Sequence, residues 1–143
     1  MIVWSLLCAG SAIDNTSNNI SLFNVLEQLA VSYEANGHLL PIRFEHVSTW
    51  QRDDPAVPET YPAWLTILSP DGETLGKIEF DVDLSDSERA RIRHQFAQFQ
   101  IRGEGRYQFE LSADKGEGEH VLHRVPLAVS FDPASGDEPA TLE

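Results

Sequence analysis

The sequence predicts an all-β fold, a two-sheet antiparallel β-sandwich of about seven or eight strands of the immunoglobulin-like or C2-like type. Short segments of alternating apolar and polar residues recur along the chain, separated by clusters of Asn, Asp, Pro and Gly. The clearest segment is 105–111, where Tyr107, Phe109 and Leu111 share one face of an extended strand. Sandwiches often place a tyrosine corner in such a strand, with the hydroxyl bonded to nearby backbone.

The N-terminal third predicts a strand, a hairpin turn and a second element. Residues 2–13 are apolar on both faces, which suits a strand buried between layers, or an assembly surface if nothing covers it internally. The Asn-rich stretch 14–19 predicts a turn. Residues 20–29 are either a strand or a short helix, and the short turn before them favours a strand.

The middle of the chain predicts three strands. Residues 39–50 alternate in polarity, and the Pro-rich, charged stretch 51–60 after them predicts a loop. A hairpin is expected to join residues 64–68 to 75–82, because the turn at 69–72 has proline second and glycine fourth, as in a type I turn. In its second strand, Ile78, Phe80 and Val82 are expected to face inward.

Residues 88–101 are compatible with two structures. Ser85 and Glu88 have the spacing of a helix capping box, but apolar and basic residues alternate from Arg89 to Phe96, which favours a strand with a later bulge. A closing strand is predicted at 121–131, where Pro126 indicates a sheet edge or an amide that no neighbour needs. The prediction is one domain, 1–131, with a flexible acidic tail, 132–143.

Five features occur together along the chain: Cys8 in the opening strand, the turn leading into residues 21–25, the turn at 70–72, the Arg-rich segment 89–94 and residues 105–109. In combination they resemble an uncharacterised bacterial single-domain family of unknown function that is expected to form immunoglobulin-like or C2-like sandwiches. The resemblance implies a fold but no activity, cofactor or catalytic residue.

Composition limits the classes of function. The 143 residues carry 23 acidic and 10 basic side chains, a formal net charge of −13, which disfavours binding to nucleic acid or anionic lipid and favours a basic or neutral partner. The single Cys8 can form no internal disulfide, which indicates a reducing compartment. Because no apolar run approaches the roughly 20 residues of a membrane span and the start lacks a basic segment, we expect a cytoplasmic protein.

Three arginines are the main concentration of positive charge. Arg89, Arg91 and Arg93 share one face of an extended strand and are candidates for docking an acidic partner or a phosphate, since guanidinium groups suit bidentate contacts. The alternative, which the sequence favours, is that they form cross-strand ion pairs with Glu79 and Asp81 on the preceding strand.

The tryptophans are expected in the core. Trp50, however, borders the charged loop at 51–60, so the alternative is that it lies exposed on a partner-binding surface.

One loop gathers carboxylates. Asp81, Asp83, Asp86 and Glu88 are candidate calcium ligands of the kind that C2 domains carry on loops, although their spacing does not match an EF-hand. A solvated acidic loop is the alternative and is favoured.

The histidines and the cysteine predict no catalytic centre. His120 and His123 are three apart, which on a strand puts them on opposite faces, so they form no zinc-binding pair. His94 and His123 fall on apolar faces and are expected to be hydrogen-bonded core residues, and Cys8 is expected to be an inert buried thiol.

The sequence therefore predicts a non-enzymatic module that binds a protein partner or assembles with itself, with no cofactor. A calcium- or ligand-binding C2-like domain that uses the loop 81–88 is the second hypothesis. The third is a hydrolase whose site is dispersed in the sequence.

Overall fold

The structure, a computed structural model, describes residues 1–132 and is all-β. Except for Asp132, the predicted tail 132–143 lies outside the described residues. A four-stranded sheet, sheet A, has the order β2-β1-β5-β8, and a five-stranded sheet, sheet B, has the order β3-β11-β10-β6-β7. Strands β4 and β9 form a third, two-stranded sheet.

The strand bounds follow the chain, and a short 3-10 helix lies between β3 and β4. The strands of sheet A are β1 Ile2–Ile13, β2 Ile20–Val25, β5 Phe44–Gln51 and β8 Arg89–Phe96. Those of sheet B are β3 Gln28–Val31, β6 Glu59–Leu68, β7 Thr74–Leu84, β10 Gly105–Asp114 and β11 Glu119–Phe131. The short elements are β4 Leu39–Leu40, β9 Phe99–Gln100 and the helix Tyr33–Ala35.

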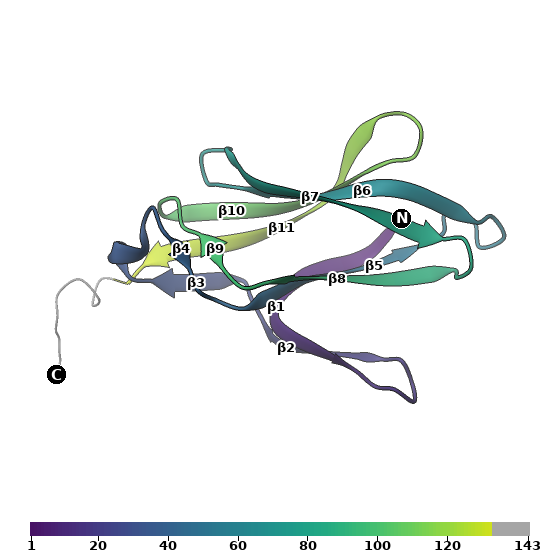
Figure 1. Ribbon diagram of the computed structural model, residues 1–143, viewed down its shortest axis with the longest axis horizontal. Coiled ribbons are helices and arrows are strands. Elements are labelled where there is room, and N and C mark those ends of the chain that lie inside the picture. Colours follow the sequence, from purple (N-terminus) through teal and green to yellow (C-terminus); the bar gives the residue numbers. More distant parts are fainter. Residues whose placement is uncertain (133–143) are drawn as a thin grey trace.

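The core lies between sheets A and B. In Figure 1 the layer with β6, β7 and β10 lies above the layer with β1, β5 and β8. One cluster of buried side chains joins Leu7 and Trp50 of sheet A to Leu65, Phe109 and Leu127 of sheet B. Alternation along each strand explains this arrangement, because every second side chain points into the space between the layers.

Strand β10 confirms the prediction made from its alternating residues. Tyr107, Phe109 and Leu111 are all fully buried. The Tyr107 hydroxyl donates to the carbonyl oxygen of Gly103 at 2.7 Å and accepts from the backbone nitrogen of Arg102 at 2.6 Å. The phenol ring therefore fills the core while its hydroxyl satisfies two backbone groups of the preceding loop.

A turn and a glycine fix where β10 begins. The predicted turn at 69–72 forms, with the Gly72 amide donating to the Ser69 carbonyl oxygen at 3.0 Å. Its Pro70 packs against Gly105, where an added Cβ would lie 2.8 Å from Pro70 Cβ. Gly105 also has a φ of 137°, so both the close approach of Pro70 and the backbone conformation require a glycine at this position.

Three predicted strands are each divided in the structure. Residues 20–29 are extended as predicted, but they form β2 and β3, which belong to different sheets. The division falls where the Leu26 amide donates to the Leu7 carbonyl oxygen. Residues 39–50 form β4 and β5, separated by the segment that contains Pro41. Residues 88–101 are β8 and β9, so the strand prediction there is confirmed and the helix alternative is wrong.

Only some of the residues predicted to face inward in β7 are fully buried, and β11 is likewise buried over only part of its length. Val82 is fully buried, but Ile78 is 36% exposed. In β11 the buried side chains are Val125, Leu127 and Val129, whereas Val121 is 44% exposed. The register between β10 and β11 shifts near Leu111, and the first part of β11 leaves the core beyond that point.

We predict that Tyr107→Phe lowers the free energy of unfolding by about 1–3 kcal/mol, because the Gly103 carbonyl and the Arg102 amide lose their shared partner. Urea denaturation of the variant and the parent protein measures the difference. The control is Tyr33→Phe, because Tyr33 is 63% exposed. Equal effects of the two variants would contradict a structural role for the Tyr107 hydroxyl.

Candidate functional site

The three arginines lie on the outer face of sheet A. Strand β8 is an edge strand that pairs only with β5 within the described residues, with Arg91 opposite Thr49 and Arg93 opposite Val47. Ala90, Ile92 and Phe96 of β8 pack against the core. Because alternate residues of a strand point to opposite faces, Arg89, Arg91 and Arg93 point outward; we call them the arginine face.

The arginine face makes hydrogen bonds to neutral oxygens. Arg89 Nε donates to Gln51 Oε1 at 2.9 Å. One terminal nitrogen of Arg91 donates to the Asn18 carbonyl oxygen at 2.9 Å, and one of Arg93 donates to Ser11 Oγ at 3.0 Å. Among the ion pairs within residues 1–132, none involves these three arginines.

The expected ion pairs with Glu79 and Asp81 are therefore wrong. Those two residues lie on β7, which pairs with β6 in sheet B, whereas β8 belongs to sheet A. The chain crosses from one sheet to the other between Leu84 and Arg89, so β7 and β8 are neighbours in sequence but not in a sheet.

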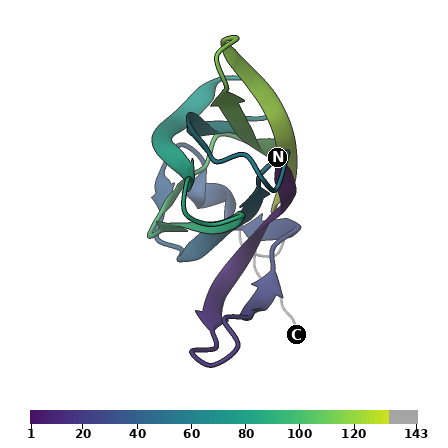
Figure 2. The same cartoon turned by 90° about the vertical axis from the view of Figure 1, so that its right-hand side faces the viewer.

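The β1–β2 hairpin lies against the outer face of sheet A. Figures 1 and 2 show it leaving the body of the molecule as β1 passes the end of β5. The bonds from Arg91 and Arg93 to Asn18 and Ser11 hold this hairpin beside β8. The prediction of a strand followed by a hairpin is confirmed.

The hairpin gives sheet A a buried outer face. Val47 is fully buried although it lies outside the core between the sheets, with Leu6 and Arg93 as its cross-strand partners. Cys8, opposite Glu45, is also fully buried, and burial raises the pKa of its thiol. The thiolate is therefore disfavoured, as expected for an inert cysteine.

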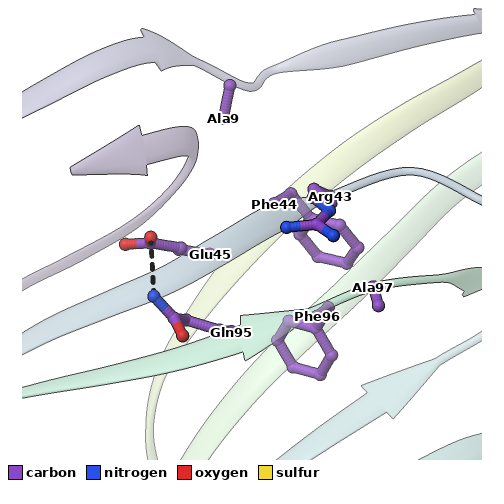
Figure 3. Close-up of a pocket in the computed structure, with 7 residues that line it drawn as sticks. All are labelled: Ala9, Arg43, Phe44, Glu45, Gln95, Phe96 and Ala97. Carbon is purple, nitrogen blue, oxygen red and sulfur yellow. Dashed lines mark hydrogen bonds between the residues drawn. The ribbon is translucent and has the colours of Figure 1, made fainter.

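Glu45 is a buried carboxylate that no sequence motif indicates. Ser11 Oγ donates to its Oε1 at 2.5 Å, and Gln95 Nε2 donates to its Oε2 at 3.2 Å. Figure 3 shows Glu45 and Gln95 beside Arg43 and Phe44, lining a hollow of about 430 Å³ at one end of β5 and β8. Alternation along residues 39–50 puts Glu45 on the face opposite Phe44 and His46, and no sequence pattern indicates that a hairpin covers that face.

A second hollow separates the hairpin tip from the arginine face. It has a volume of about 270 Å³ and is open to solvent. We call it the hairpin cleft, and its lining residues are all without negative charge: Ser17, Asn18, Asn19, Thr49, Arg89, Ala90 and Arg91.

Trp50 is not a surface residue. It is fully buried, and its Nε1 donates to Ser48 Oγ at 2.8 Å. The alternative in which Trp50 meets a partner is therefore wrong, and the core position is observed.

The carboxylates of 81–88 lie along the end of β7 and the loop after it. Asp83 Oδ1 accepts from the amide and hydroxyl of Ser85 and from the hydroxyl of Thr60. The Ser85 hydroxyl is the main reason that the pKa of Asp83 is lowered. Within residues 1–132, no three His, Cys, Asp or Glu side chains are arranged so that they could hold a metal ion. The structure thus does not bring Asp81, Asp83, Asp86 and Glu88 together as a ligand set, and calcium binding stays a hypothesis.

The histidines expected to be hydrogen-bonded core residues, His94 and His123, differ from that expectation in hydrogen bonding or in burial. His46 is fully buried with neither ring nitrogen bonded, and His94 lies beside it with its Nδ1 unbonded; their ring centroids are 6.3 Å apart. His123 is exposed rather than buried, with its Nδ1 2.6 Å from Ser5 Oγ. Burial, with smaller contributions from His94 and His123, lowers the pKa of His46 to about 3.

The comparisons with known proteins add no relative. No protein-family model matches the chain, and no curated protein is similar to it in sequence. None of the helices formed by residues 1–132 is long and apolar enough to cross a membrane.

We predict that Ser11→Ala lowers the free energy of unfolding by about 1–3 kcal/mol, because buried Glu45 and Arg93 lose the hydroxyl that joins them. Denaturant unfolding measures the change. The matched control is Ser21→Ala on exposed β2, for which we expect a change within about 0.5 kcal/mol. A Ser11 variant as stable as the Ser21 variant would show that the hairpin is held without this hydroxyl.

We also predict that the protein loses stability as the pH falls below about 6.5, because unfolded His46 takes up a proton that the folded state excludes until about pH 3. Between these values the unfolded state binds more protons, so His46 alone lowers the free energy of unfolding by about 1.4 kcal/mol per pH unit.

Urea titrations at pH 7, 6 and 5 test this dependence. His46→Phe, which keeps a ring against Phe109, is expected to give a shallower dependence, whereas the exposed-site control His38→Gln keeps the parent slope. Parallel slopes for the parent and His46→Phe would contradict the assignment to His46.

Proposed function

We propose that this chain is a non-enzymatic binding or assembly module that engages a protein partner through the arginine face of β8. The observation that carries the proposal is that Arg89, Arg91 and Arg93 form no ion pair with a described carboxylate, in a chain whose net charge is −13. Arginines that bond only to neutral oxygens keep their charge available for an acidic group. The partner segment is therefore acidic.

The module is a two-sheet sandwich of the immunoglobulin-like or C2-like type. Support comes from Tyr107, whose hydroxyl bonds to the backbone of Gly103 four residues upstream, as in a tyrosine corner. The order of strands in sheets A and B, with a core between them, is compatible with such a sandwich.

The only thiol and the most buried imidazole of the described residues are not placed for catalysis. Burial disfavours the thiolate of Cys8, and His46 is fully buried with no hydrogen-bond partner. A nucleophile and a base need access to a substrate and to each other.

We predict that Arg89→Gln/Arg91→Gln/Arg93→Gln abolishes capture of the natural partner by tagged protein in the native host at endogenous level, because the acidic segment loses its guanidinium contacts. The control is Arg102→Gln/Arg106→Gln/Arg124→Gln, which changes the net charge equally. Two of its arginines pair with Glu73 and Glu110, away from β8.

Quantitative mass spectrometry of the captured proteins, followed by reconstitution with each purified candidate, measures the outcome. A partner that binds the β8 variant as tightly as the control variant would overturn the proposal.

A further inference from the structure

We propose that the hairpin cleft is a binding subsite for a single carboxylate group, presented by an acidic segment of the partner. This inference rests on the proposed function and names the chemistry of its recognition site. It starts from the lining of the cleft, which combines Arg89 and Arg91 with the hairpin residues Asn18 and Asn19 and with Thr49.

The guanidinium groups of Arg89 and Arg91 have N–H donors that make no hydrogen bond within the described residues. Within residues 1–132, Arg89 makes one hydrogen bond, from Nε to Gln51, which leaves both of its terminal nitrogens for a ligand. Arg91 makes one, to the Asn18 carbonyl oxygen, and its Nε is buried without a partner. A guanidinium group carries five donors in a planar fork, and a carboxylate is the group that such a fork binds with two parallel bonds.

None of the residues that line the cleft is acidic. The nearby carboxylates are already bonded, Asp14 to Thr16 and Ser17 of the hairpin turn, and Glu45 to Ser11 and Gln95. The side-chain amides of Asn18 and Asn19 and the hydroxyl group of Thr49 can donate to the oxygens of the bound carboxylate. The volume of about 270 Å³ holds a carboxylate with several waters, because a water occupies about 30 Å³.

The geometry of the guanidinium group favours a carboxylate over a phosphate at the cleft. A planar carboxylate matches an arginine fork with both of its oxygens and leaves no third oxygen to satisfy.

The cleft is formed by two segments that are distant in sequence. Residues 17–19 belong to the hairpin turn, and Thr49, Arg89 and Arg91 belong to β5 and β8. The bond between Arg91 and Asn18 holds the hairpin turn beside β8, so Arg91 both contacts the carboxylate and anchors the hairpin.

The test uses the full chain and three probes at equal ionic strength: a capped hexaglutamate peptide, a capped hexaglutamine peptide and inorganic phosphate. Isothermal calorimetry measures affinity, and amide NMR shifts locate the site. We expect hexaglutamate to bind, hexaglutamine not to bind, phosphate to bind more weakly, and the shifts to concentrate at Asn18, Asn19 and Thr49.

The variants distinguish binding at the cleft from a general effect of positive charge on the surface. Arg89→Gln leaves the Arg91–Asn18 fastening in place and is expected to weaken hexaglutamate binding about tenfold, because one charge-assisted contact is lost. Arg91→Gln is expected to weaken it at least as much. The control Arg106→Gln, an exposed arginine on β10, removes the same charge and is expected to change affinity less than about twofold.

Each outcome decides between the two proposals. No hexaglutamate binding, equal losses in Arg89→Gln and Arg106→Gln, or tighter binding of phosphate than of hexaglutamate would overturn the carboxylate subsite. If hexaglutamate binds at the cleft but the natural partner is still captured by the triple β8 variant, the subsite stands and the proposed partner surface fails. If the triple β8 variant loses the partner but hexaglutamate does not bind the parent protein, the proposed partner surface stands and the carboxylate subsite fails.

Discussion

The burial of strand β5 on both faces is the constraint on which the rest of the structure depends. Every residue from Phe44 to Trp50 is buried, although only alternate ones face the core between the sheets. The hairpin formed by the second half of β1 and by β2 lies over the other face as a third layer. Its Ser11 bonds to Glu45 of β5 and to Arg93 of β8, and its Asn18 accepts from Arg91. Val47 is thereby removed from water and Leu6 is half-buried, which favours the docked hairpin.

The arginine face has two roles because of this third layer. Arg91 and Arg93 each donate one hydrogen bond to the hairpin. The acceptors are a backbone carbonyl and a hydroxyl group rather than a carboxylate. A neutral acceptor orients a guanidinium group but does not cancel its charge. The same contacts that fix the hairpin therefore leave positive charge beside a cleft lined by Asn18 and Thr49. Structural and binding roles are compatible here because a guanidinium group has more donors than either role uses.

The local structure was predictable from the sequence, and the long-range structure was not. Alternation located the Tyr107 strand and favoured a strand at 88–101, because the period of two is a property of each segment by itself. Pairing between segments follows no local rule. Glu79 and the arginine face were expected to meet because their strands are consecutive, yet the strands belong to different sheets. Asn18 and Ser11 lie 73 and 82 positions from the arginines that they contact, so no spacing could indicate the cleft.

The distribution of charge limits which partners the arginine face can engage. Glu79, Asp81 and Asp83 lie exposed on β7 in the other large sheet, so the chain is negative overall and positive only locally. At physiological salt the Debye length is about 8 Å, so exposed charges farther away than this are largely screened. A partner that places one or a few carboxylates at the cleft therefore meets mainly the guanidinium groups. An extended polyanion spans several Debye lengths and also meets the surrounding carboxylates, so recognition at this surface favours a short acidic segment over nucleic acid.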